Sequence, residues 1–417
     1  MRMDYQHRIL ALLALLIAFP TIHLFRGFRT LFHSLTLKYL NMRLLYSALC
    51  LVLFVSLANV TFAQDSEVLN EALVSRFKQR WSKIPKDSMP ETPLIIRGAV
   101  DAYYMAGKAP LPTSFTGGSN NSFSLGMANV IFSKEGKIGF VADLAFGPRA
   151  EGANGGFDAD GKITTLTMIK QLYVTYTPFE ALKFTMGNFS TFYGYELIDA
   201  PLNVNYSTSY LFSYGPFFHT GIKANVALSD KFGAMIGLFG DTDTKIDVVK
   251  GKHLGAQLSY AGGKLSAYFN YLGGRFAEET ETTPEIMSNQ VDLTATFQAT
   301  EKFGLGLNIA QRFLTDDDGN DATWGGAALY AKYAFSDSFL FGLRAETIND
   351  KDGFLFGEKD NNILALTFSG NISILGNLKL IPELRFDNAK VNGTFTSYSD
   401  EALKANSVFL LAAVYSF

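Results

Sequence analysis

The sequence predicts an all-β fold: a transmembrane antiparallel β-barrel of about sixteen strands, with fourteen or eighteen as the alternatives, preceded by a short periplasmic helix. Three observations lead to it: an alternating, aromatic-edged last strand, apolar residues diluted by alternation, and connections that alternate between short and long. Hydrophobic residues make up 48% of the chain and charged residues 18%. Beyond the first 65 or so residues, however, no apolar run reaches the roughly 20 residues of a membrane helix. Membrane strands suit this composition, because they need an apolar residue only at every second position.

The last strand gives the clearest pattern, because Phe409, Leu411, Ala413, Tyr415 and Phe417 recur at every second position. Successive side chains of a strand point to opposite faces, so these five form one apolar stripe. An edge strand of a soluble β-sandwich would also alternate. In a barrel, we expect Phe409, Tyr415 and Phe417 to form the signal read by the barrel-assembly machinery, so that deleting Phe417 impairs assembly rather than permeation.

The N-terminal part reads as a leader. Residues 42–63 combine Arg43, an apolar core and small residues before Gln64, which predicts a secretory signal peptide cleaved after Ala63. Residues 1–41 hold a second apolar run and are interpreted as an upstream extension from a mis-assigned start, with a membrane anchor as the alternative. The one cysteine, Cys50, lies in the leader. The mature chain would therefore have no thiol for disulfides, metal binding or catalysis.

Between the leader and the barrel, which is expected over 94–417, lies a periplasmic segment of residues 64–93. Apolar residues spaced by three and four predict an amphipathic helix over about 66–83, ended by Pro85. This helix could lie at the periplasmic rim or plug the lumen, and the sequence does not decide between the two.

The body of the chain contains sixteen alternating segments separated by connections of alternating length. The segments are expected at about 94–105, 122–134, 137–147, 165–178, 181–192, 217–228, 231–240, 253–261, 263–273, 288–299, 302–313, 323–335, 338–348, 361–374, 377–387 and 405–417. The long connections fall near 106–121, 148–164, 193–216, 241–252, 274–287, 314–322, 349–360 and 388–404. Outer-membrane barrels have short periplasmic turns and long extracellular loops. An even strand number then returns the C-terminus to the periplasm.

The alternation also assigns each strand residue to a face. Apolar stripes expected to face lipid include Leu265, Ala267, Phe269 and Tyr271; Leu329, Ala331, Tyr333 and Phe335; Phe339, Phe341, Leu343 and Ala345; and Leu378, Leu380, Leu384 and Phe386. Charges expected to line the pore are Arg97, Asp101, Arg312, Lys332, Arg344, Glu346, Glu383 and Arg385. Because unpaired buried charges are costly, this face is expected to be wet. Pro382 falls on the lipid-facing parity, where a bulge would explain it.

The most distinctive stretch is MGNFSTFYGYELIDAPLNVNYSTSYLFSYGPFFHTGIKA, residues 186–224. It resembles the OmpL-like β-barrel porins, the second bacterial porin family of that name. The residues that carry the resemblance are Gly187, Phe189, Gly194, Tyr195, Glu196, Ile198, Asp199, Asn203, Asn205, Tyr206, Ser207, Ser209, Leu211, Phe212, Tyr214, Gly215, Pro216, Phe217, His219, Thr220 and Gly221. Segments 98–105, 121–134 and 171–178 resemble further strands of the family. Thr208 departs from it, since arginine is more common there.

The resemblance implies that the third long loop (193–216) narrows the pore. The candidate constriction residues are Glu196, Asp199, Asn203, Asn205, His219 and Lys223. The acceptors among them would face basic lumen groups such as Lys223 and Arg344, which would create a transverse field for polar solutes. Alternatively, Tyr195, Tyr206 and Phe212 pack the loop onto the wall and the motif is architectural.

Two other motifs contain residue types that could carry chemistry. Asp316, Asp318 and Asn320 resemble part of a calcium loop, but the bidentate glutamate is missing. His219 with Ser209 or Ser213 would suggest a lipid hydrolase, but His219 shares the lumen-facing parity of Lys223, whereas such an enzyme needs a lipid-facing site. We therefore expect no enzyme and no cofactor.

The function expected from the resemblance is a porin-like channel of the bacterial outer membrane for passive diffusion of small hydrophilic solutes. Its partners would be outer-membrane lipid, the assembly machinery and those solutes, and a homo-oligomer is compatible with it. The alternative is a structural or adhesive barrel that binds an extracellular partner through its loops. A net charge of -3 gives no basic field for nucleic acid. The sequence names neither solute nor selectivity.

Overall fold

A computed structural model describes residues 92–113, 115–116, 120–155, 164–246, 251–277 and 285–417. All of these belong to one compact unit, Met89–Phe417. The expected upstream extension, signal peptide and helix over 66–83 lie outside the described residues. Among the described residues, no helix is long and apolar enough to cross a membrane.

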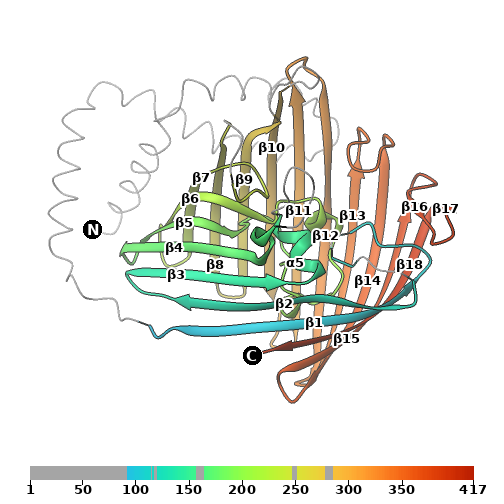
Figure 1. Ribbon diagram of the computed structural model, residues 1–417, viewed down its shortest axis with the longest axis horizontal. Coiled ribbons are helices and arrows are strands. Elements are labelled where there is room, and N and C mark those ends of the chain that lie inside the picture. Colours follow the sequence, from blue (N-terminus) through green and yellow to red (C-terminus); the bar gives the residue numbers. More distant parts are fainter. Residues whose placement is uncertain (1–91, 114, 117–119, 156–163, 247–250, 278–284) are drawn as a thin grey trace. The chain divides into compact units, whose positions relative to one another are not determined.

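Sixteen antiparallel strands form one closed barrel, which confirms the predicted fold class and strand number (Figure 1). The strands are β1 (Ile95–Gly107), β2 (Ser122–Lys134), β3 (Ile138–Phe146), β4 (Ile169–Phe179), β5 (Leu182–Ser190), β6 (Phe218–Ala227), β7 (Phe232–Phe239), β8 (His253–Gly262), β9 (Leu265–Ala277), β10 (Ile286–Gln298), β11 (Phe303–Asp316), β12 (Asp321–Ser336), β13 (Phe339–Asp350), β14 (Asn361–Ile374), β15 (Leu378–Ala389) and β18 (Ala405–Ser416). Each pairs with its sequence neighbours, except that β15 pairs with β18 across the last long loop.

The long loops contain the remaining elements. Within the described residues these are α5 (Pro148–Asn154), η1 (Thr165–Met168), η2 (Ala200–Leu202), α6 (Tyr210–Ser213) and a two-stranded hairpin of β16 (Phe395–Thr396) and β17 (Ala402–Leu403). Short turns join β2 to β3, β4 to β5, β6 to β7, β8 to β9, β10 to β11, β12 to β13 and β14 to β15. These turns lie at one end of the barrel, which we call the short-turn end. The opposite end is the long-loop end.

The barrel closes between its first and last strands. Val100 of β1 lies opposite Tyr415 of β18 in an antiparallel register. Beyond the strand, Phe417 N–H donates to the Gly98 carbonyl at 3.0 Å, and Gly98 N–H donates to the Phe417 carbonyl at 3.1 Å. Among the described strands, closure leaves the barrel sheet without an unpaired edge, which a membrane barrel requires because lipid cannot satisfy backbone groups. Phe417 thus lies at the short-turn end.

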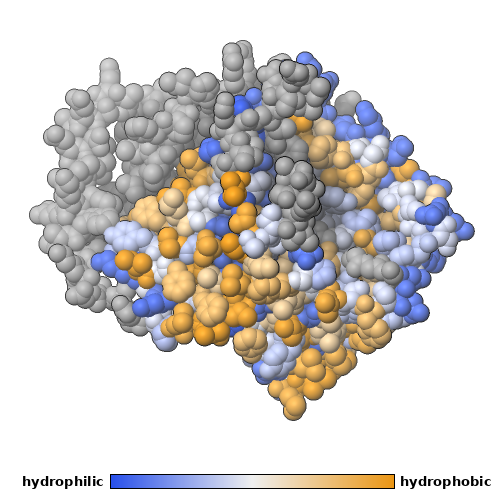
Figure 2. Space-filling view, viewed as in Figure 1, coloured by the Kyte–Doolittle hydropathy of each residue, from blue (hydrophilic) through white to orange (hydrophobic). Residues whose placement is uncertain are grey.

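The outward side chains are those that the alternation predicted. Along β18, Phe409, Leu411, Tyr415 and the terminal Phe417 are exposed, while Leu410 and its inward neighbours are buried. Figure 2 shows hydrophobic residues over much of the visible barrel wall, with hydrophilic residues gathered where β16 and β17 lie. Outward aromatics cluster near strand ends, where the ring centroids of Tyr333, Phe335 and Phe339 follow one another at 4.8 and 5.6 Å. Such rings suit a membrane interface.

Three local expectations differ from the structure. The strand expected from residue 165 begins at Ile169, because the Thr164 side chain accepts a hydrogen bond from Leu166 N–H and starts the 3-10 turn η1. The loop expected over 314–322 is short, since β11 and β12 extend and leave only 317–320 between them. No bulge accompanies Pro382, because the β14–β15 register is the same on both sides of it. Only the pairs of Pro382 and Ile381 are missing from this ladder.

Shortening the terminal side chain provides a test of the assembly signal. The Phe417 ring packs so closely over Gly98 that a Cβ at Gly98 would lie 2.5 Å from Phe417 Cζ. Phe417→Ala retains the backbone bonds but loses this packing, so we expect several-fold less folded barrel in the membrane fraction, measured by the heat-dependent shift of the folded band in gels. Phe269→Ala, an outward substitution in β9, is the matched control. Equal yields for both variants would contradict the signal.

Candidate functional site: the third loop and the lumen

The third loop, which the sequence placed at 193–216, connects β5 and β6 and is shaped by its own polar side chains. The Asn203 amide donates to the Leu197 carbonyl at 2.7 Å and its oxygen accepts from Leu197 N–H at 3.0 Å, which pins the loop across six residues. Ser209 caps α6, because its hydroxyl accepts a hydrogen bond from Phe212 N–H at 3.1 Å. These local bonds give the loop a defined conformation that it presents to the barrel wall.

The loop meets β13 through Arg344, whose side chain is fully buried. Its guanidinium donates to Glu196 Oε1 at 2.7 Å and to the Ser207 carbonyl at 2.6 Å, both in the loop. Its Nε lies 3.3 Å from Glu346 Oε1 on the same strand. Glu346 in turn accepts Tyr210 N–H of the loop at 2.7 Å. The arginine therefore joins one wall carboxylate to one loop carboxylate.

A second buried arginine, Arg385 of β15, continues this network. It donates to Asp387 Oδ1 at 2.9 Å and to the loop carbonyl of Thr208 at 2.7 Å, and its Nη2 lies 3.5 Å from Glu346 Oε1. Its guanidinium also lies over the Tyr210 ring, 4.9 Å from the centroid. Buried charges are tolerated only when paired and hydrogen-bonded, and these contacts meet that condition.

A third anchor joins the loop to β1, β15 and the second long loop. The Tyr206 hydroxyl donates to Asp101 Oδ2 at 2.5 Å, while backbone N–H groups of Tyr206 and Ser207 donate to Glu383 at 2.7 and 3.0 Å. Arg149 of α5 lies over the Tyr206 ring at 4.9 Å and 3.5 Å from Asp101. Burial raises the pKa of the Tyr206 hydroxyl above its usual range, so it stays protonated and acts as a donor.

The opposite side of the loop binds the wall at β2, β3 and β4. Lys170 Nζ donates to Asp143 at 2.7 Å and to Asp199 of the loop at 2.6 Å, and Asn129 donates to both carboxylates at 3.1 Å. The alternation did not single out Lys170, because a register shift between Asp143 and Leu144 moves it inward. Arg149 was likewise missed, since nothing in the sequence shows that the second loop folds onto the third.

Glycines on the inward wall let the third loop approach the backbone. A Cβ at Gly342 of β13 would lie 2.1 Å from Val204 Cγ1, and one at Gly306 of β11 would lie 2.3 Å from the Tyr195 hydroxyl. Tyr195 itself stacks on Tyr330 of β12 with ring centroids 4.2 Å apart. These two glycines therefore lie where the loop and the wall are in close contact.

The structure places the candidate constriction residues in or beside this loop. Glu196, Asn203, Asn205 and His219 are buried, and Asp199 and Lys223 are partly buried. The Asn205 amide donates to Ser369 of β14 at 2.7 Å. Glu196 and Arg344 are thus in direct contact rather than facing each other across open space.

The expected pore-lining charges all lie on the inward parity, but they divide into two groups. One group is at most 9% exposed and consists of Asp101, Arg344, Glu346, Glu383 and Arg385. The sequence predicted that these side chains line water, whereas in the structure they are buried. The physical reason is that the third loop covers them and supplies partners. Arg97 is exposed, and Arg312 and Lys332 are partly exposed.

His219 and Asp316, the residues of the two other motifs, have structural partners. His219 Nε2 lies 3.0 Å from Thr191 Oγ1, and the ring stacks on Phe239 at 4.9 Å. Asp316 accepts the backbone and side-chain N–H groups of Asn320 at 2.7 and 2.9 Å within a hairpin turn. Within the part of the chain that the structure describes, no group of three or more histidine, cysteine, aspartate and glutamate residues is arranged to hold a metal ion.

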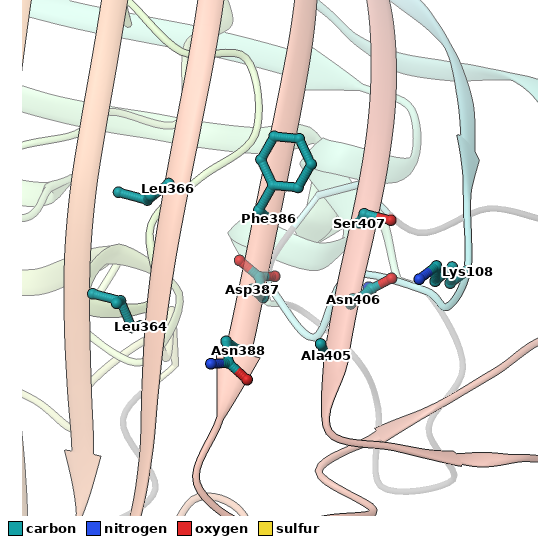
Figure 3. Close-up of a pocket in the computed structure, with 9 residues that line it drawn as sticks. All are labelled: Lys108, Leu364, Leu366, Phe386, Asp387, Asn388, Ala405, Asn406 and Ser407. Atoms are coloured by element: carbon teal, nitrogen blue, oxygen red, sulfur yellow. The ribbon is translucent and has the colours of Figure 1, made fainter.

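One cavity, of about 380 Å³, lies on the outer side of the wall rather than in the lumen (Figure 3). It is lined by Lys108 and by residues of β14, β15 and β18, among them the outward Leu364, Leu366 and Phe386. Because these side chains belong to the lipid-facing parity, this cavity is a groove of the lipid-facing surface and not part of the candidate site.

Removing the Arg344 charge tests the network. Arg344→Met leaves Glu196 and Glu346 buried without their shared cation, which should destabilise the barrel by about 3–5 kcal/mol. The measurement is the urea concentration at which half of the protein unfolds in detergent or vesicles. Leu343→Met, the outward neighbour, is the matched control and should unfold like the unmodified chain. If Arg344→Met also unfolds like the unmodified chain, the network does not hold the loop.

A family model described as "Putative beta-barrel porin-2, OmpL-like" matches residues 93–417. No curated protein matches the chain in sequence.

Solved structures share the fold. The anion-selective porin from Comamonas acidovorans has 14% identity and a TM-score of 0.54, covering 78% of this chain and 99% of that chain. OmpT of Vibrio cholerae in its trimer form has 12% identity and a TM-score of 0.54 over 79% and 100%. The outer membrane channel DcaP of Acinetobacter baumannii has 14% and 0.51 over 80% and 99%. Since the family model spans the entire barrel, including the third-loop motif, this chain belongs to the OmpL-like β-barrel porins and is a porin-like protein of the bacterial outer membrane.

Proposed function

We propose that this chain is a channel for passive diffusion of small hydrophilic solutes, with the third loop as its constriction. The observation that carries the proposal is the path of the loop. It leaves the wall between β5 and β6 and contacts inward residues on the far strands, such as Arg344 of β13 and Glu383 of β15. A sixteen-stranded barrel is wide enough for an aqueous lumen, so a loop that crosses it sets the narrowest section.

The wall opposite the network supports the same assignment. Phe192, next to the loop, packs with Phe239 at 5.8 Å between centroids, and its carbonyl accepts from Gln257 of β8 at 3.2 Å. Gln257 and its neighbour Ser259 on the inward face are only partly buried. This part of the wall is therefore polar and partly exposed to solvent, which suits diffusion of hydrophilic solutes.

A second candidate is a structural or adhesive barrel with a plugged lumen. It is favoured by the burial of the inward face toward the long-loop end, where Asn361, Ile363, Ala365, Thr367 and Ser369 of β14 are at most 1% exposed. In that case the loops would bind an extracellular partner. The expected N-terminal helix over 66–83 could contribute to such a plug, and deleting it would then open conductance.

Recording from the purified chain in planar lipid bilayers separates these candidates. The channel proposal expects stepwise conductance from the unmodified chain, because a fixed constriction still passes water and small ions. A folded barrel that inserts but remains silent would overturn the proposal and leave the plugged barrel.

Widening the proposed constriction is a second test. Phe192→Ala and Tyr195→Ala each remove a ring from the loop and its immediate flank, so the conductance of a single channel should rise. Phe269→Ala removes the same ring from the lipid-facing side of β9, where Phe269 is exposed, and should leave the conductance unchanged. If all three variants conduct alike, the narrowest section lies elsewhere.

The oligomeric state is proposed from proteins of similar fold. OmpT of Vibrio cholerae is described in a trimer form, and we propose a homo-oligomer for this chain on that analogy of fold. Cross-linking of the native outer membrane would reveal its subunit number.

A further inference from the structure

Five cations lie on the inward face near the short-turn end, and we call them the basic collar. They are Arg97 of β1, Lys183 of β5, Lys223 of β6, Lys332 of β12 and Lys379 of β15. Each lies at most four positions from the residue that ends its strand at the short-turn end. Because the barrel is closed, strands distant in sequence bring these charges to one end of the same lumen.

The collar is accessible to water. Arg97 and Lys183 are exposed, and Lys223, Lys332 and Lys379 are partly buried. Tyr268 lies on the inward parity of β9, between the collar strands β6 and β12, and is also accessible, with 39% of its surface exposed. The collar therefore lies in the wet part of the lumen.

No carboxylate neutralises the collar within the described residues. Lys223 Nζ lies 4.1 Å from the centre of the Phe189 ring, and Lys379 Nζ donates to the Pro201 carbonyl at 3.1 Å. The ion pairs found among the described residues involve other cations, such as Arg344 and Lys170. A phenyl ring and a neutral carbonyl carry no net negative charge, so these two contacts do not neutralise the lysines.

The surrounding inward positions are uncharged. Those of the other strands at this level include Ser133, Val141, Thr177, Asn225, Ser259, Tyr268, Gln298 and Ser373. The buried inward carboxylates begin farther up the strands and include Asp101, Asp143, Asp292, Glu346, Asp350, Glu383 and Asp387, all at most 9% exposed. Of these, Asp292 accepts hydrogen bonds from Asn270 at 2.5 Å and Gly194 N–H at 3.2 Å. Buried and bonded, they contribute little negative potential to the wet lumen.

The short turns themselves do not offset the collar. Within the described residues their exposed carboxylates are Glu135, Glu180, Asp230, Glu301 and Asp337, and lysines of equal number flank them at Lys134, Lys137, Lys231, Lys264 and Lys302. Opposite charges interleaved on an exposed rim are screened within about 8–10 Å at physiological ionic strength. A narrow lumen with low-dielectric walls instead focuses the field of its own charges.

We propose that the short-turn half of the lumen is an anion-attracting vestibule, and that the channel prefers small anions, such as carboxylates and phosphates, over cations. The preference for permeation rests on the proposed channel function, whereas the vestibule is a property of the barrel whether or not it conducts. Rings of charged side chains are a general basis of ion selectivity in pores.

Selectivity is tested by the reversal potential of the purified chain in a bilayer with a tenfold KCl gradient. The expected sign is that of chloride preference. The triple variant Lys183→Gln, Lys223→Gln, Lys332→Gln should lower the chloride-to-potassium permeability ratio several-fold. Lys231→Gln with Lys264→Gln, on the exposed turns, is the control and should not change it. Conductance with potassium preference, or a triple variant identical to the unmodified chain, overturns the inference.

A measurement that does not need conductance tests the vestibule itself. Tyr268→Cys, in a Cys50→Ala background, places one thiol in the wet lumen. Anionic and cationic methanethiosulfonate reagents of similar size are compared for their labelling rates, each normalised to a free thiol. The anionic reagent should be faster by several-fold, and the lysine triple variant should remove that advantage. Faster cationic labelling overturns the vestibule. Silent bilayers with faster anionic labelling overturn only the channel.

Discussion

The structure depends on one electrostatic constraint: arginines buried inside the barrel must have carboxylates and carbonyls around them. Arg344 and Arg385 have no exposed surface, and an unpaired buried charge costs several kcal/mol. Half of their partners come from the strands and half from the third loop, including Glu196 and the carbonyls of Ser207 and Thr208. The buried polar groups of the wall and of the loop therefore find all their partners only when the loop is folded against the wall.

The buried backbone of the third loop also needs hydrogen-bond partners. A loop inside a lumen carries backbone N–H groups that need acceptors, and a buried unsatisfied donor costs about 1–3 kcal/mol. Glu383 accepts the N–H groups of Tyr206 and Ser207, and Glu346 accepts that of Tyr210. Wall carboxylates thus bind backbone as well as arginine. These bonds explain how a loop with few charges of its own stays in place. The glycine at 342 gives the loop room to approach the wall.

Most of the barrel could be predicted from the two-residue period, because a strand that faces lipid on one side and the lumen on the other must alternate. That pattern placed the sixteen strands and the inward parity of Arg344 and Glu383. It could not reveal what covers the inward face. The hydrogen bond between Tyr206 and Asp101 joins residues 105 positions apart, and no local pattern encodes such a pair. Lys170 was missed because one register shift reverses the parity.

The burial of the inward charges follows from where the third loop makes its polar contacts. The loop binds through carboxylates, so the wall's negative charge is used where the loop lies, against arginines, lysine and backbone N–H groups. Other inward lysines keep contact with solvent, where a charge costs little: Lys183 is exposed and Lys332 partly exposed. A net charge of -3 for the whole chain therefore says nothing about the sign of the lumen. That sign is set by which charges the loop leaves in contact with solvent.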